Sequence, residues 1–161
     1  MGRARLGIGT AVAAGALALG GLAFAPAAAA VTPTVATAEY DCGIFGGGTA
    51  QLTAAQTGSG IVVSVETAVT TPLQINPGDA TTSLTLALNG SGTAVFTGSS
   101  NPLMPSGTPY KSGPLTSATS FATGDSLDSY FGGTALTLSI FGTTVSCDAV
   151  TAQDPGAFVA D

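Results

Sequence analysis

One serine and two aspartates are the side chains of this sequence whose types and spacing come nearest to a catalytic set. Ser126 follows Asp125 directly, and Asp128 comes two residues later. A serine hydroxyl is a useful nucleophile near neutral pH only when a general base accepts its proton, and that base is most often a histidine. The chain contains no histidine. The sequence therefore predicts no complete catalytic set and no catalytic residue.

The tetrapeptide Gly124-Asp125-Ser126-Leu127 resembles the signature of the GDSL-type lipases and esterases. In that family the serine needs a histidine on a late Asp-x-x-His segment, and the motif ends the first strand of an α/β domain. Here the tetrapeptide falls late in the chain and has no such partner, so we interpret it as a turn. A hydrolase that uses Ser126, or acid–base chemistry by Asp125 and Asp128, is the enzymatic alternative.

Two cysteines, Cys42 and Cys147, lie near the two ends of the foldable part of the chain. A redox or metal site is disfavoured because there is no Cys-x-x-Cys spacing and no histidine, and no run of ligands resembles a calcium loop. We therefore expect no metal and no cofactor, and we expect the two cysteines to form one disulfide. This disulfide would close a loop of about 105 residues, which corresponds to roughly 4–5 kcal/mol of stabilisation in the chain-entropy description.

The first thirty residues have the three parts of a secretory signal peptide. Arg3 and Arg5 precede an apolar run over 6–24, and small residues fill 25–30. This pattern predicts cleavage after Ala30 and an extracellular location, with an uncleaved membrane anchor as the alternative.

Cleavage would leave Lys111 as the single cation against nine carboxylates, a net charge of about −8. Such a chain cannot displace counterions from phosphates, and it is not attracted to anionic lipid headgroups. We therefore expect no nucleic-acid partner, no stable membrane insertion after cleavage, and an unknown protein or cell-envelope partner.

Period-two alternation of apolar residues recurs along the chain and predicts an all-β domain over 38–150. It would follow a flexible leader at 31–37 and precede a C-terminal tail at 151–161. The clearest strands are 61–70, 81–88 and 134–140. Spacing of about eight to twelve residues favours a single antiparallel β-sandwich of about seven to nine short strands.

Turn residues punctuate this pattern. Asn76-Pro77-Gly78-Asp79 is typical of a type II turn, and Asn89-Gly90 is typical of a hairpin. Dense proline and glycine predict a long connection over 98–114, followed by a strand at 115–122. We expect a short helical turn at 127–131.

The Pro-rich loop at 101–111 is the candidate binding surface. It contains Leu103, Met104, Tyr110 and Lys111, which combine apolar side chains with the cation that remains after cleavage. Loops on a rigid β scaffold often carry binding sites. The alternative is that Leu103 and Met104 plug one end of the core.

The chain also resembles small secreted actinobacterial proteins with immunoglobulin-like β-sandwiches. The resemblance rests on Tyr40-Asp41-Cys42, on Ile75-Asn76-Pro77-Gly78-Asp79, and on the closing segment Gly142-Thr143-Thr144-Val145-Ser146-Cys147. It implies a fold and an extracellular address and no particular activity. We therefore expect a non-enzymatic interaction or structural module of the cell envelope, with a small-ligand carrier as the alternative.

Overall fold

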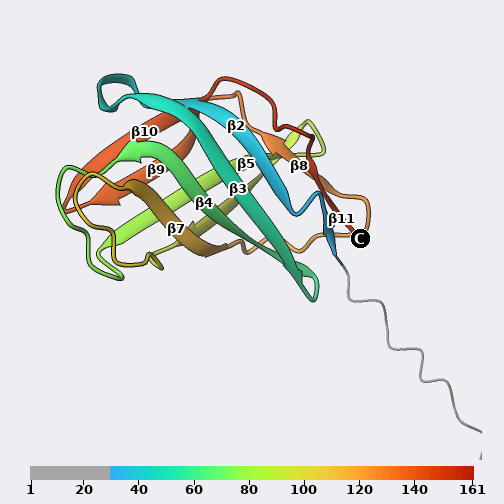
Figure 1. Cartoon of the computed structure of the whole chain (residues 1–161). Coiled ribbons are helices and arrows are strands. Elements are labelled where there is room, and N and C mark those ends of the chain that lie inside the picture. The colour runs from blue at the N-terminus through green and yellow to red at the C-terminus, as the bar shows by residue number, and fades with distance from the viewer. Residues whose placement is uncertain (1–29) are drawn as a thin grey trace, which may run out of the picture.

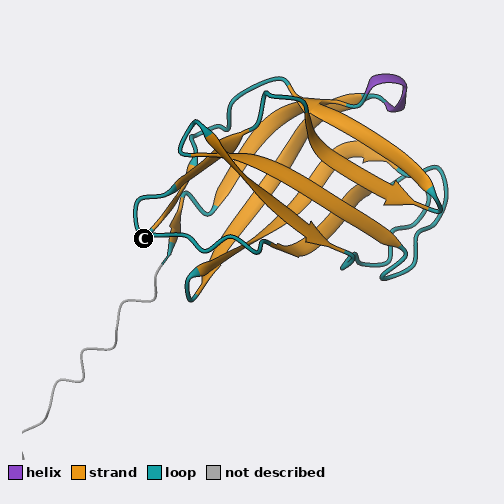
Figure 2. Cartoon of the chain, turned by 180° about the vertical axis from the view of Figure 1, so that it is seen from behind, coloured by secondary structure: helices purple, strands orange, loops and turns teal. Residues whose placement is uncertain are grey.

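The computed structural model describes residues 30–161, so the predicted signal peptide, apart from Ala30, lies outside the described residues. Within them no helix is long and apolar enough to cross a membrane. The regular secondary structure of the described chain is almost entirely β-strand (Figures 1 and 2). Its elements are β1 (Val31–Thr32), β2 (Val35–Asp41), the 3-10 helix η1 (Gly43–Phe45), β3 (Gly47–Thr57), β4 (Gly60–Thr70), β5 (Ala80–Leu88), β6 (Gly92–Gly98), β7 (Pro109–Thr116), β8 (Ser126–Ser129), β9 (Thr134–Ile140), β10 (Thr143–Ala149) and β11 (Phe158–Ala160).

Eight of these strands form a closed antiparallel barrel (Figure 1). They pair in the order β5, β6, β7, β4, β3, β2, β10 and β9, and the ring closes where β9 pairs with residues 80–84 of β5. The all-β antiparallel prediction is confirmed, but the closed ring replaces the two separate sheets of the expected immunoglobulin-like sandwich. Alternation shows which face of a strand is buried, whereas closure depends on which distant strand pairs with it.

Three short strands continue the sheet beyond the ring. β8 pairs with residues 86–88 of β5, β11 pairs with β8, and β1 pairs with β11. Residues 31–37 and 151–161 therefore contribute strands, in place of the expected leader and tail. These segments are held against the barrel because Val31, Phe158 and Ala160 bury their apolar side chains, which is favourable.

The barrel interior is filled by the inward-facing residues of alternating strands. On β4, Ile61, Val63 and Val65 are buried while the residues between them are partly exposed, as the alternation predicts. Leu84 and Leu86 of β5 are likewise fully buried. This packed interior gives the barrel a rigid wall from which the connecting loops project.

Three further segments differ from the sequence-based expectation. The strand expected over 38–45 ends at Asp41, the last residue of β2, and 43–45 form η1. β7 begins at Pro109, within the expected connection, and ends at Thr116, within the strand expected over 115–122. Proline is tolerated because Pro109 is the first residue of the strand and the β4–β7 pairing is irregular there and further along. The expected helical turn at 127–131 is the strand β8 over most of its length, because Leu127 pairs with Leu88 of β5.

The predicted turns and disulfide are confirmed. Asn89 and Gly90 both have positive φ at the β5–β6 hairpin. In the 76–79 turn, Gly78 has a φ of 84°, and the amide of Asp79 donates to the carbonyl of Asn76. Cys42, just after β2, forms a disulfide with Cys147 on β10.

Candidate functional site

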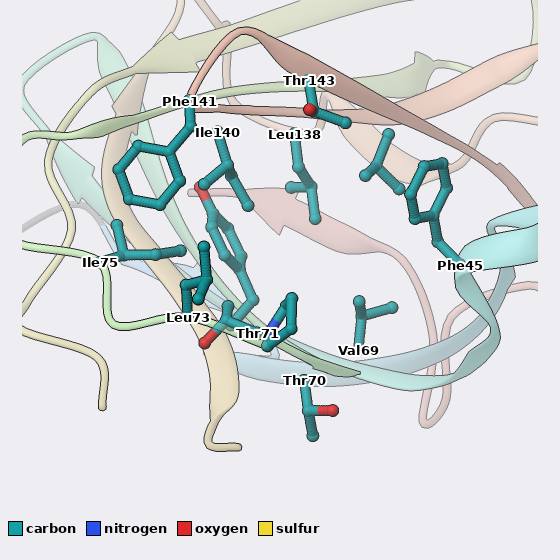
Figure 3. A pocket seen from close by; sticks show the side chains of 13 residues that line it. Phe45, Val69, Thr70, Thr71, Leu73, Ile75, Leu138, Ile140, Phe141 and Thr143 are labelled. Atoms are coloured by element: carbon teal, nitrogen blue, oxygen red, sulfur yellow. The ribbon is translucent and has the colours of Figure 1, made fainter. Parts of the chain in front are cut away.

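An apolar cavity of about 370 Å³ opens at one end of the barrel (Figure 3). It lies where the end of β4, the connection that follows it, and the β9–β10 hairpin approach η1 and β7. Its lining consists mainly of apolar and aromatic side chains: Phe45, Val69, Thr70, Thr71, Pro72, Leu73, Ile75, Tyr110, Leu138, Ile140, Phe141, Thr143 and Val145.

The floor of the cavity is held by buried residues of the barrel. Ile75, Tyr110 and Leu138 are almost completely inaccessible to solvent. The hydroxyl of Tyr110 forms a hydrogen bond of 2.7 Å with Thr82 Oγ1, and burial raises the pKa of Tyr110. Because that hydroxyl is neutral and already paired, Tyr110 offers mainly its ring to the cavity.

The mouth of the cavity is framed by three exposed apolar side chains. Phe45 follows from η1, Leu73 from the connection after β4, and Phe141 from the β9–β10 turn (Figure 3). They are 45%, 63% and 57% exposed. Three segments that are distant in the sequence thus bring large apolar groups to one opening.

The chemistry of the lining is that of an uncharged pocket. None of its thirteen residues carries a carboxylate, an amine or a thiol, and its polar groups are threonine and tyrosine hydroxyls. Thr71 Oγ1 is buried and has no hydrogen-bond partner among the described residues. An uncharged apolar molecule suits this lining, because a charged group would lose hydration without gaining a partner.

The residues of the GDSL-like tetrapeptide lie elsewhere and hold a turn. Asp125 accepts hydrogen bonds of 2.8 Å from Asn89 Nδ2 and from the amide of Ala122, and these bonds lower the pKa of Asp125. The amide of Ser126 donates to Asn89 Oδ1 at 2.9 Å, and its hydroxyl lies 3.4 Å from the same oxygen. Asp125 and Ser126 thus fasten the β5–β6 turn to the start of β8.

Asp128, the second carboxylate of the suggested acid–base pair, has different partners. Its Oδ1 accepts hydrogen bonds from the amides of Ser129 and Gln153, at 2.7 and 2.9 Å. Asp125 and Asp128 therefore each hold a separate stretch of backbone. No group of three metal-ligating side chains gathers anywhere within residues 30–161.

The structure separates the four residues of the predicted binding loop. Leu103 is exposed, whereas Met104 and Tyr110 are buried, so the core-plug alternative describes Met104 but not Leu103. Lys111 forms an ion pair of 2.9 Å with Glu66 and borders a second hollow of about 190 Å³. Of the four, Tyr110 lines the apolar cavity.

The residues at the mouth were not singled out by the sequence. Phe45 ends the segment 38–45, whose alternation favours a strand, and Phe141 lies in a segment that reads as a turn, where exposed side chains carry little signal. One signal was present in the dipeptide Phe141-Gly142, because a hairpin turn normally has Asn, Asp or Gly before its glycine.

Comparison of the chain with protein-family models, with curated proteins and with solved structures finds no match.

Proposed function

We propose that the protein is a secreted, non-enzymatic carrier that binds one small, uncharged, apolar molecule in the cavity framed by Phe45, Leu73 and Phe141. The cavity is the observation that carries the proposal. Its volume of about 370 Å³ lies within the range of about 300–1,000 Å³ typical of small-molecule sites. Its lining, which is apolar with a few hydroxyls, is also typical of such sites.

The exposure of the apolar side chains at the mouth of the cavity supports the same function. Large apolar side chains that gather around one opening remain in contact with water in the free protein, which is unfavourable. A ligand that covers them removes this apolar surface from water. The barrel beneath provides a preformed site, so little ordering is needed on binding.

Secretion is part of the proposal. Arg3 and Arg5 precede an apolar run, which is the pattern of an export signal. The Cys42–Cys147 disulfide is the kind of bond that persists in oxidising compartments. The ligand would therefore be met outside the cytoplasm.

The proposal is tested with N-phenyl-1-naphthylamine, an uncharged probe whose fluorescence rises in apolar surroundings. The disulfide-bonded protein should bind one probe molecule with saturation, and native mass spectra should show the same one-to-one complex. Leu73→Glu should weaken binding by about ten-fold or more, because the carboxylate must be desolvated at the mouth. Val95→Glu is the matched control: Val95 is also exposed, lies on β6, and does not line the cavity.

Two results would contradict the carrier function. One is the absence of saturable binding by the unmodified protein. The other is equal weakening by Leu73→Glu and Val95→Glu, which would indicate adsorption to the surface at large.

A second candidate is the interaction module expected from the sequence, and one residue favours it. Ile44 of η1 is 96% exposed and does not line the cavity, so a small ligand held inside gives it no role. A partner protein that docked on the rim would cover it. Ile44→Ser should leave probe binding unchanged if the carrier function is the correct one.

A further inference from the structure

Phe141 occupies a backbone conformation that its side chain disfavours. Phe141 and Gly142 form the two-residue connection of the hairpin in which Ile140 pairs with Thr143. Their φ values are 51° and 78°, the two positive values of a type I′ turn. A non-glycine residue in the left-handed region brings its Cβ close to a carbonyl oxygen, and this is least tolerated for bulky side chains.

The same chain contains a turn that serves as a comparison. Asn89 and Gly90 have φ values of 52° and 71°, and Asn89 and Phe141 are the two non-glycine residues with positive φ within residues 30–161. Asn89 uses its side chain to bind Asp125 and the amide of Ser126. Phe141 has no hydrogen-bonding group, and its side chain is mostly exposed.

Neither turn chemistry nor burial in the free protein accounts for a phenylalanine at this position. Its ring lies at the mouth of the cavity, on the opposite side from Phe45 (Figure 3). Tyr110 adds a third ring to the lining, and its hydroxyl is already bonded to Thr82. Phe45 and Phe141 therefore present exposed rings at the mouth, with the buried ring of Tyr110 behind them, and aromatic rings prefer to pack against other rings in offset or edge-to-face arrangements.

We infer that Phe141 is the ligand-contacting residue at the mouth of the cavity, and that the ligand carries a flat, unsaturated ring that packs against it. The inference rests on the proposed carrier function and adds the chemical class of the ligand. Strained residues are retained where the strain serves a site, and here the strain holds a ring over the opening.

Two substitutions separate the ring from the strain. Phe141→Asn should raise the melting temperature by about 2–5 °C, because the left-handed turn tolerates asparagine. It should also weaken binding of N-phenyl-1-naphthylamine by about ten-fold or more. Phe141→Leu keeps an apolar side chain and the backbone strain but removes the ring. It should weaken binding of the aromatic probe. The affinity for 1-decanol, a saturated competitor, should stay unchanged when it is calculated from displacement of the probe and corrected for the weaker probe binding.

Phe131→Asn is the matched control, because Phe131 is equally exposed and does not line the cavity. It should leave the affinity for the probe unchanged. If the unmodified protein binds the probe and Phe141→Asn binds it equally well, this inference is overturned and the carrier function still stands. A lower melting temperature for Phe141→Asn shows that the ring serves the fold and overturns it as well. Absence of binding by the unmodified protein overturns both proposals.

Discussion

Tyr40 carries a buried polar atom that affects the stability of the barrel. Its side chain points into the barrel, and its hydroxyl has no hydrogen-bond partner among the described residues. Burial, followed by the charge of Asp128, raises the pKa of Tyr40 to about 12 from its usual value of 10.0. Both causes act on the phenolate, because burial removes its hydration and the carboxylate repels it.

This shift predicts a loss of stability in alkali. The folded protein keeps the proton of Tyr40 up to a pH of about 12, whereas the unfolded chain releases it near pH 10.0. The stabilising contribution is therefore complete below pH 10 and lost as the pH rises towards 12. The free energy of unfolding should fall with a slope that approaches about 1.4 kcal/mol per pH unit in this window. Urea unfolding at pH 9, 10 and 11 measures the slope.

Tyr40→Phe is the control, since it removes the titrating group and keeps the ring. This variant should lose most of the alkaline slope, with a remainder from Tyr110, whose pKa is also raised by burial. It should be at least as stable as the unmodified protein at pH 7, because an unpaired buried hydroxyl is unfavourable. A slope identical to that of the unmodified protein would show that Tyr40 is not the group responsible.

At the scale of elements, Asn101 joins two connections at the cavity end of the barrel. Its Oδ1 accepts hydrogen bonds from the amides of Gly78 and Ala80, at 3.0 and 3.2 Å. Its Nδ2 donates to the carbonyls of Asn76 and Pro102, at 2.9 and 2.8 Å. One buried side chain therefore supplies the partners that these stretches of irregular backbone would otherwise lack.

Asn101→Ala should lower the free energy of unfolding by about 2–4 kcal/mol, because it removes four hydrogen bonds to the backbone, one of them buried and three partly buried. Urea denaturation measures the change. Ser106→Ala is a suitable comparison, since Ser106 also binds a carbonyl, that of Pro72, but lies exposed in the same connection. It should change stability by less than about 0.5 kcal/mol. Similar losses for the two variants would argue against Asn101 as the joining residue.

The elements could be predicted from the sequence where alternation is strong. The strand at 134–140 has the expected bounds, and β4 and β5 begin one residue before theirs, because their branched and apolar side chains alternate without interruption. The sequence predicts the strand of β7 too late because dense proline argues against a strand, although an irregular ladder accommodates proline. β1 and β11 carry almost no local signal, since β1 is a strand through its pairing with β11, and β11 through its pairing with β1 and β8.

The candidate site was less predictable than the elements, for a related reason. Tyr110 was singled out, but Phe45, Leu73 and Phe141 come together only through closure of the barrel. The sequence identifies residues that face inward from a strand, whereas a cavity mouth is made of residues that face outward from turns. Pairing between distant strands decides which turns meet, and that information is not local.

At the scale of the whole molecule, the barrel has two seams with few paired residues. β6 pairs with β7 at the single position Thr97 and Thr116. β2 pairs with β10 through Asp41 with Asp148 and Tyr40 with Ala149. The Cys42–Cys147 disulfide lies directly beside this second seam. The disulfide therefore links the two strands β2 and β10 at one of the shortest pairings in the ring.

Removing this bond should weaken the whole barrel, because all of β3 to β9 lies within the closed loop. The two cysteines are separated by 105 positions, and a loop of that length corresponds to about 4–5 kcal/mol of stabilisation in the chain-entropy description. The double variant Cys42→Ser and Cys147→Ser should lose about this much in urea unfolding, and the reduced unmodified protein should follow the same curve. If the double variant and the oxidised protein unfold at the same urea concentration, the β2–β10 seam holds through its packing alone, and the disulfide is not what closes the barrel.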